Sequence, residues 1–161
     1  MSPLTLLPAQ MAASVVSFAL LVMCVLWPWL RTLTRERALL VLVWPQTLRH
    51  LGATMLSPFV ANAALSTDFT HAVALGDAAT MLFAGATVLA LHRKSRAAIP
   101  LAWVTSLVGL ADLLHNFVLA RIHQVAPHLG PQWYVIAFGV PAMLVFHLAA
   151  ITVLTRRAST H

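Results

Sequence analysis

An acid, an imidazole and an amide lie close together in the apolar stretch 97–120. Asp112 precedes His115 by three residues and Asn116 by four. On a helix this spacing brings the three side chains to one face. Carboxylate and imidazole groups are common acids and bases in enzymes. Because such groups are costly to place in a lipid-spanning helix, they predict a functional site.

Other apolar stretches carry ionisable or amide groups at a similar depth. These groups are Asp77 in the stretch 69–91 and Gln46, Arg49 and His50 in the stretch 38–61. The depth of each group follows from its distance in sequence from the expected helix end, at a rise of about 1.5 Å per residue. Asp77 and Asp112 then lie roughly 12 and 13 Å below the outer ends of their helices, and Arg49 lies roughly 17 Å below. The polar side chains of several helices are therefore expected to meet in the outer half of a bundle.

The charges in this group do not balance. Arg49 stays charged in nearly any environment, whereas Asp77 and Asp112 can each take up a proton. The remaining negative charge could be balanced by a proton on one carboxyl, by a protonated His50 or His115, or by a bound cation. The sequence therefore predicts a site that titrates near neutral pH. The expected acid–base residues are Asp77, Asp112 and His115, and the expected substrate-binding residues are Gln46, Arg49, His50 and Asn116.

The composition identifies the elements that must position these residues. Of the 161 residues, 60% are hydrophobic and 9% are charged, whereas soluble domains carry about 25% charged residues. We therefore expect one all-α integral membrane domain, residues 1–161, with five transmembrane helices. Their expected bounds are 8–30, 38–61, 69–91, 97–120 and 131–154. The second helix is the least regular, because Pro45 and Pro58 interrupt it.

The cationic residues predict how the bundle is oriented. Alternate gaps and the C-terminal tail hold eight of them, namely Arg31, Arg35, Arg37, Arg93, Lys94, Arg96, Arg156 and Arg157. The other gaps hold only Arg121. Under the positive-inside rule the N-terminus is outside and the C-terminus is cytoplasmic, in a multi-pass protein of the cell inner (plasma) membrane. The formal charge of +6 is thus explained by topology, and we expect the bilayer, not nucleic acid, as the partner.

These features favour proton-coupled binding, or acid–base conversion, of a small lipophilic or anionic molecule. Arg49 would orient the ligand, and Asp77 and Asp112 would exchange protons. The sequence lacks the HExxH, CxxC, P-loop and GxGxxG patterns, which argues against zinc-protease, thiol-redox and nucleotide chemistry. It does not decide between an enzyme and a transporter, and it names no cofactor.

Two alternatives remain open. In the first, the chain is a redox module, with His50 and His115 ligating a haem, or with both aspartates joining them around a divalent metal. In the second, it is a subunit of a membrane complex with no chemistry of its own. The sequence leaves open whether a homo-oligomer forms. The roles of His147 and of the outer-rim residues Asp68, His71, His123 and His128 are also open.

Overall fold

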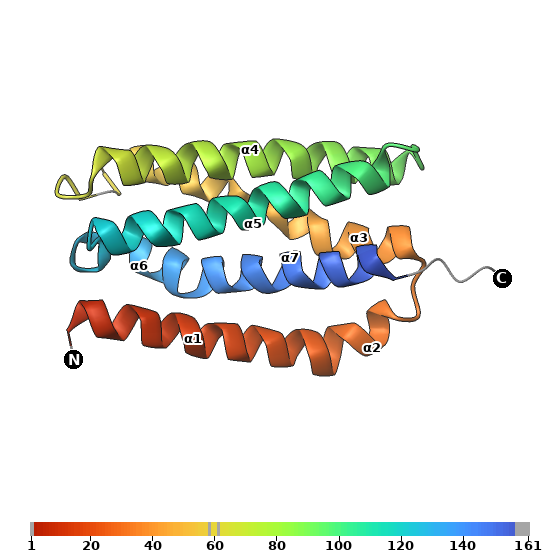
Figure 1. Ribbon diagram of the computed structural model, residues 1–161, viewed down its shortest axis with the longest axis horizontal. Helices are drawn as coiled ribbons and strands as arrows, with labels where there is room; N and C mark the ends of the chain where they lie inside the picture. The colour runs from red at the N-terminus through yellow and green to blue at the C-terminus, as the bar shows by residue number, and fades with distance from the viewer. Residues whose placement is uncertain (1, 58, 61, 157–161) are drawn as a thin grey trace.

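The computed structural model describes residues 2–57, 59–60 and 62–156, and every regular element within them is helical. The elements in chain order are α1 (Pro3–Leu21), η1 (Val22–Leu26), α2 (Trp27–Leu30), α3 (Arg35–Val43), η2 (Trp44–Leu56), α4 (Thr67–His92), α5 (Ala98–Ile122), η3 (Ala126–His128), α6 (Gln132–Tyr134), η4 (Val135–Gly139) and α7 (Val140–Thr155). The long helices lie side by side as one elongated bundle (Figure 1).

Four helical stretches are long and apolar enough to cross a membrane: Pro3–Leu30, Thr67–His92, Ala98–Ile122 and Gln132–Thr155. Two of them contain a π-helical turn, η1 and η4, and each turn is followed closely by a proline. Pro28 and Pro141 have no N–H group, and their rings clash with the carbonyl four residues earlier. Those carbonyls, of Cys24 and Ala137, lie inside the π turns, so the wider turn accommodates each proline without ending the helix.

The remaining stretch, where we expected a helix over 38–61, has two parts. It is α-helical from Arg35 to Val43, and then continues as a 3₁₀ helix from Trp44 to Leu56. Pro45 stands at the start of the 3₁₀ part, where it removes a backbone donor. Pro58 and residue 61 lie outside the described residues. The change of helix type sets which side chains face the bundle.

A 3₁₀ helix has three residues per turn, so side chains three apart lie in one straight row. The buried residues of η2 follow this period: Gln46, Arg49, Gly52 and Met55. An α-helix would spread the same residues around its axis. The 3₁₀ geometry therefore places these four residues on a single buried face of η2, and η2 packs against α4.

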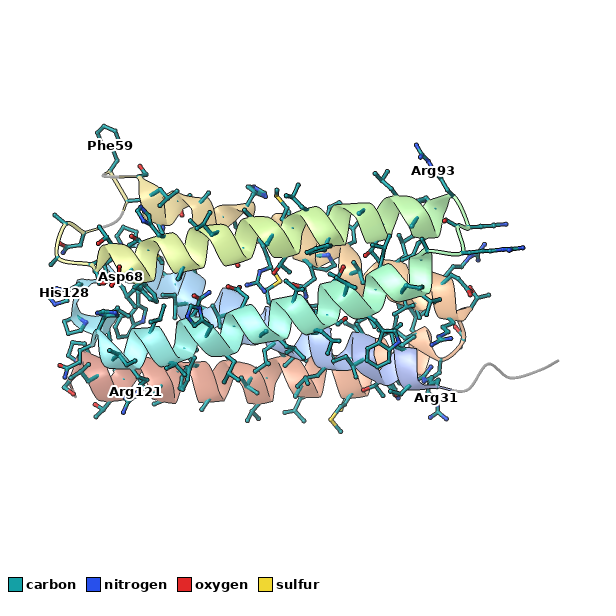
Figure 2. The ribbon with its side chains drawn as sticks, turned by 45° about the horizontal axis from the view of Figure 1, so that its top comes forward. Arg31, Phe59, Asp68, Arg93, Arg121 and His128 are labelled. Atoms are coloured by element: carbon teal, nitrogen blue, oxygen red, sulfur yellow. The ribbon has the colours of Figure 1, made fainter. Side chains whose placement is uncertain are left out.

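Two apolar clusters fill the bundle, one toward each end. The first includes Leu30, Leu42 and Leu91, and it adjoins the end where Arg31 and Arg93 lie, which we call the cationic end (Figure 2). The second includes Leu7 and Phe69, near the opposite end, where Figure 2 shows Asp68, Arg121 and His128. The charged side chains of Arg49, Asp77 and Asp112 lie between these two clusters.

Candidate functional site

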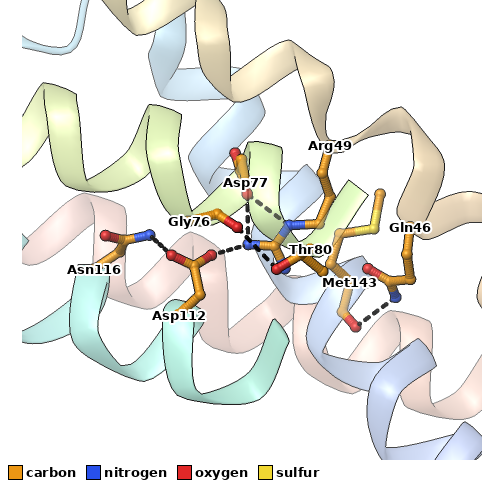
Figure 3. A network of polar contacts seen from close by, with 8 residues as sticks. All are labelled: Gln46, Arg49, Gly76, Asp77, Thr80, Asp112, Asn116 and Met143. Atoms are coloured by element: carbon orange, nitrogen blue, oxygen red, sulfur yellow. Dashed lines mark hydrogen bonds and ion pairs between the residues drawn. The ribbon is translucent and has the colours of Figure 1, made fainter. Parts of the chain in front are cut away.

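Arg49 joins two carboxylates that come from two other helices. Its Nε donates to Asp77 Oδ1 at 2.6 Å, and its Nη2 lies 2.5 Å from the same oxygen. Nη2 also donates to Asp112 Oδ2. Figure 3 shows the guanidinium of η2 between Asp77 on α4 and Asp112 on α5. The structure thus brings three of the candidate residues, far apart in sequence, into direct contact.

This cluster is shielded from solvent. The side chain of Arg49 is 3% exposed, that of Asp112 is 7% exposed and that of Asp77 is 16% exposed. Charges so placed interact strongly, and removing one partner of a buried ion pair costs about 3–5 kcal/mol. One guanidinium against two carboxylates leaves a formal charge of −1 when both acids are ionised. The cluster is therefore both a tie between three helices and a place where a positive charge or a proton is stabilised.

Two amides support the cluster. Asn116 Nδ2 donates to Asp112 Oδ1 at 2.8 Å, as expected for residues four apart on a helix. Gln46, one 3₁₀ turn before Arg49, donates from Nε2 to the carbonyl oxygen of Met143 at 3.3 Å. The first contact fixes the orientation of the Asp112 carboxylate, and the second ties η2 to α7 (Figure 3).

His50 and His115, which the sequence grouped with these residues, lie on exposed faces of their helices. In η2 each residue turns by about 120°, so His50 points away from the buried row that contains Arg49. On α5, at about 100° per residue, His115 lies about 60° from Asp112 on the side away from Gly109 and Leu113, which are buried. Asn116 lies on the buried side instead, and it is the neighbour that reaches Asp112.

Gly52 and Gly76 make room for the two carboxylates. A Cβ atom on Gly52 would collide with the carboxylate of Asp77, and one on Gly76 would collide with that of Asp112. Sequence reasoning did not identify these glycines as part of the site. Each is nevertheless close to a candidate residue, since Gly52 follows Arg49 by three positions and Gly76 directly precedes Asp77. Small residues let membrane helices approach closely. A glycine near a candidate residue in the sequence therefore indicates a close helix contact at the site.

Gly109 makes room for His147 in the same way. A Cβ atom there would collide with the imidazole ring. Since Gly109 precedes Asp112 by three residues, His147 lies about one turn of α5 from the cluster, toward the cationic end. The ring is 1% exposed, and its Nε2 has no hydrogen-bond partner among the described residues. The sequence had placed His147 apart from the site, whereas the structure places it next to the cluster.

A cavity of about 420 Å³ opens on the other side of the cluster. Its walls come mainly from α1, η2, α4, α5 and the α6–η4 segment, and most of the wall residues are apolar. Leu7, Met11 and Phe69 are among the wall residues, with Arg49 and Asp77 toward the middle of the bundle and Arg121 toward the opposite end. A cavity of this size suits a small molecule.

Residues 6–155 match the model of a family described as Domain of unknown function (DUF8737). The chain belongs to this family. The matched range includes the whole charged cluster, the three glycines beside it and most of the cavity wall. No curated protein and no solved structure matches the chain.

The two carboxylates differ in their access to the cavity. Asp77 lines the cavity, whereas Asp112 does not. Both oxygens of Asp112 accept hydrogen bonds, one from Asn116 and one from Arg49. Asp77 is therefore the carboxylate positioned to meet a ligand. Among the described residues, no three His, Cys, Asp or Glu side chains are grouped as metal ligands would be.

Proposed function

We propose that this chain crosses the membrane five times, with its N-terminus outside and its C-terminus in the cytoplasm of a cell whose plasma (inner) membrane it occupies. Four helices have the required length and apolarity. The fifth crossing would be α3 with η2. At about 1.5 Å per α-helical residue and about 2.0 Å per 3₁₀ residue, these reach roughly 40 Å, more than the roughly 30 Å of a hydrocarbon core.

The distribution of charge supports this orientation. Arg31 and Arg93 lie at the same end of the bundle, and Arg121 lies at the opposite end (Figure 2). Cytoplasmic loops carry the excess of Lys and Arg in membrane proteins. With the cationic end in the cytoplasm, the cavity lies in the outer half of the bundle.

We further propose that the cavity binds a small lipophilic molecule, and that Asp77 exchanges a proton in the process. The observation that carries this proposal is the cavity itself, since its apolar walls end on a buried, charge-imbalanced cluster. Apolar walls with a few fixed polar groups are typical of small-molecule sites. An ionisable group at such a place is a natural acid or base.

Access from the side of the bundle fits this proposal. Of the four long helices, α1 is the least buried, and it packs mainly on α7 and η4 while forming one cavity wall. The π turn η4 contributes Val135 and Ile136 to another wall, and π turns are frequent at functional sites. A lipophilic ligand could therefore reach the cavity from the bilayer.

The test fills the cavity without touching the charged cluster. Ala120 lines the cavity, so Ala120→Phe should lower the affinity of the purified protein for decanol at least about tenfold, as measured by calorimetry in detergent. Ala111, on the same helix, is exposed and does not line the cavity, so Ala111→Phe is the matched control. Equal decanol binding by both variants and the unaltered protein would contradict a ligand in this cavity.

A further inference from the structure

We propose, building on the ligand site just described, that the cavity selects lipophilic cations over lipophilic anions, and that the cation competes with a proton for Asp77. The ligand class is thus an apolar chain or ring that carries a protonated amine at its buried end. Anionic ligands, which the sequence allowed as partners of Arg49, are disfavoured by the way in which that arginine is bonded.

Arg49 has no accessible donor left for an anion. Arg49 is part of the cavity wall, but its Nε and Nη2 donate to the two carboxylates. Its Nη1 has no hydrogen-bond partner among the described residues, but it is buried, out of contact with solvent. An anion could reach the guanidinium only by displacing a carboxylate from a buried ion pair. That exchange would leave the displaced carboxylate uncompensated in a medium of low dielectric constant.

Asp77, in contrast, offers an accessible acceptor. Both contacts from Arg49 go to its Oδ1, and no donor among the described residues reaches its Oδ2. It has the most exposed side chain of the three and lines the cavity. A hydrogen-bond donor at the end of a ligand would satisfy this oxygen, and a donor with a positive charge would also neutralise the cluster.

The charges around Asp77 are consistent with a cation. Arg49 on η2 and Asp112 on α5 together are neutral, and His147 on α7 lies behind them against Gly109. Neither α1 nor the α6–η4 segment contributes a charged side chain to the cavity wall. Arg121 lies nine residues beyond Asp112 on α5, which is about 14 Å, and it is exposed, so solvent screens its charge.

Binding and protonation then exclude each other. If Asp77 holds a proton when the cavity is empty, an incoming alkylammonium ion forms an ion pair with the carboxylate, and the proton leaves to solvent. The reaction balances as one cation bound for one proton released. The affinity for an amine should therefore fall as the pH falls below the range in which Asp77 loses its proton.

Three probes with the same alkyl chain test this selectivity: decylamine, decanol and decanoate. Amines of this type are protonated at neutral pH, so the set compares a cation, a neutral alcohol and an anion. Specific binding is the calorimetric signal of the purified full chain after subtraction of the signal measured with the cavity-filling variant Ala120→Phe. We expect decylamine to bind at least about tenfold more tightly than decanoate, and to lose affinity as the pH is lowered.

Variants then assign the preference to one carboxylate. Asp77→Asn should remove the advantage of decylamine over decanoate. Asp68, an exposed carboxylate in the first turn of the same helix, supplies the control, and Asp68→Asn should keep the original order. The order of the three probes on the unaltered protein, with its pH dependence, tests the proposal even if Asp77→Asn does not fold.

The outcomes separate the two proposals. If decanol binds in the cavity but decanoate binds as tightly as decylamine, cation selectivity is wrong and the lipophilic site stands. If decylamine affinity does not change with pH, the competition with a proton for Asp77 is wrong and the lipophilic site again stands. If none of the three probes shows binding that Ala120→Phe abolishes, both proposals are wrong.

Discussion

The two halves of the bundle are built from the same helices, yet one half is hollow and the other is solid. Between the cluster and the cationic end, α4 and α5 meet through small residues that are fully buried, namely Ala84, Thr87, Ala102 and Thr105. Toward the opposite end, the same two helices form walls of the cavity. Small residues at the contact allow the close approach of α4 and α5 in the solid half.

The charged cluster marks the boundary between the halves. Its three members come from η2, α4 and α5, and each carboxylate is packed against a glycine of a neighbouring helix. Helices that touch through glycine and polar side chains can diverge on one side of the contact and converge on the other. The comparison therefore predicts that changes at the boundary affect both stability and ligand binding, while changes in the solid half affect stability alone.

The largest effect should come from removing the cation at the boundary. Arg49→Met leaves two buried carboxylates without a partner, and we expect it to lower the free energy of unfolding in detergent by about 3–5 kcal/mol. Replacing the whole cluster, as Arg49→Met with Asp77→Asn and Asp112→Asn, should restore most of that loss because no buried charge remains. If the free energy of unfolding of Arg49→Met lies within about 1 kcal/mol of that of the unaltered protein, the cluster does not hold the helices together.

An intermediate effect is expected at Gly76 of α4. Gly76→Ala places a methyl group against the carboxylate of Asp112, and overpacking of this kind costs about 1–3 kcal/mol. Gly85 is on the same helix, and a methyl group there would meet no other atom within 4 Å, so Gly85→Ala should be neutral or gain up to about 1 kcal/mol. Thermal unfolding of the two variants measures the loss of stability at each position. Equal losses would contradict a special packing constraint at Gly76.

The smallest effect is expected inside the solid half. Thr87 Oγ1 donates to the carbonyl oxygen of Phe83 at 2.8 Å and lies 2.8 Å from Thr105 Oγ1. Thr87→Val leaves the Thr105 hydroxyl without its partner, whereas Thr105→Val leaves Thr87 bonded to Phe83. We therefore expect Thr87→Val to cost about 1 kcal/mol and Thr105→Val to cost less. Decanol affinity should not change in either variant, and a change would show that the halves are coupled.

Much of the fold could be predicted from the sequence, because long apolar stretches allow few other structures. The approach of Arg49 to Asp77 and Asp112 could also be predicted, since a helix rises by a fixed amount per residue and a buried charge needs a partner. The positions of His50 and His115 could not. Whether a residue next to a buried one also faces the core depends on the number of residues per helical turn and on which side of the helix is buried.

The cavity and the position of His147 could not be predicted from the sequence, for a related reason. A cavity is defined by side chains that fail to fill space, and no single residue indicates it. His147 lies beside the cluster because Gly109 leaves a gap for its ring, which depends on how α5 and α7 cross. The glycines near Arg49, Asp77 and Asp112 are the signal that the sequence offers, because a glycine leaves room for a side chain of a neighbouring helix.

The 3₁₀ geometry of η2 makes the position of Arg49 sensitive to insertions and deletions. Each residue added or lost between Gln46 and Arg49 rotates everything that follows by about a third of a turn. Deleting Thr47 or Leu48 would bring His50 to the place that Arg49 now occupies, and so exchange a permanent cation for a titratable one. A change of three residues would keep the buried row in phase, but it would move Arg49 along the helix axis by about 6 Å, away from Asp77 and Asp112. We therefore expect relatives to keep the length of this segment constant.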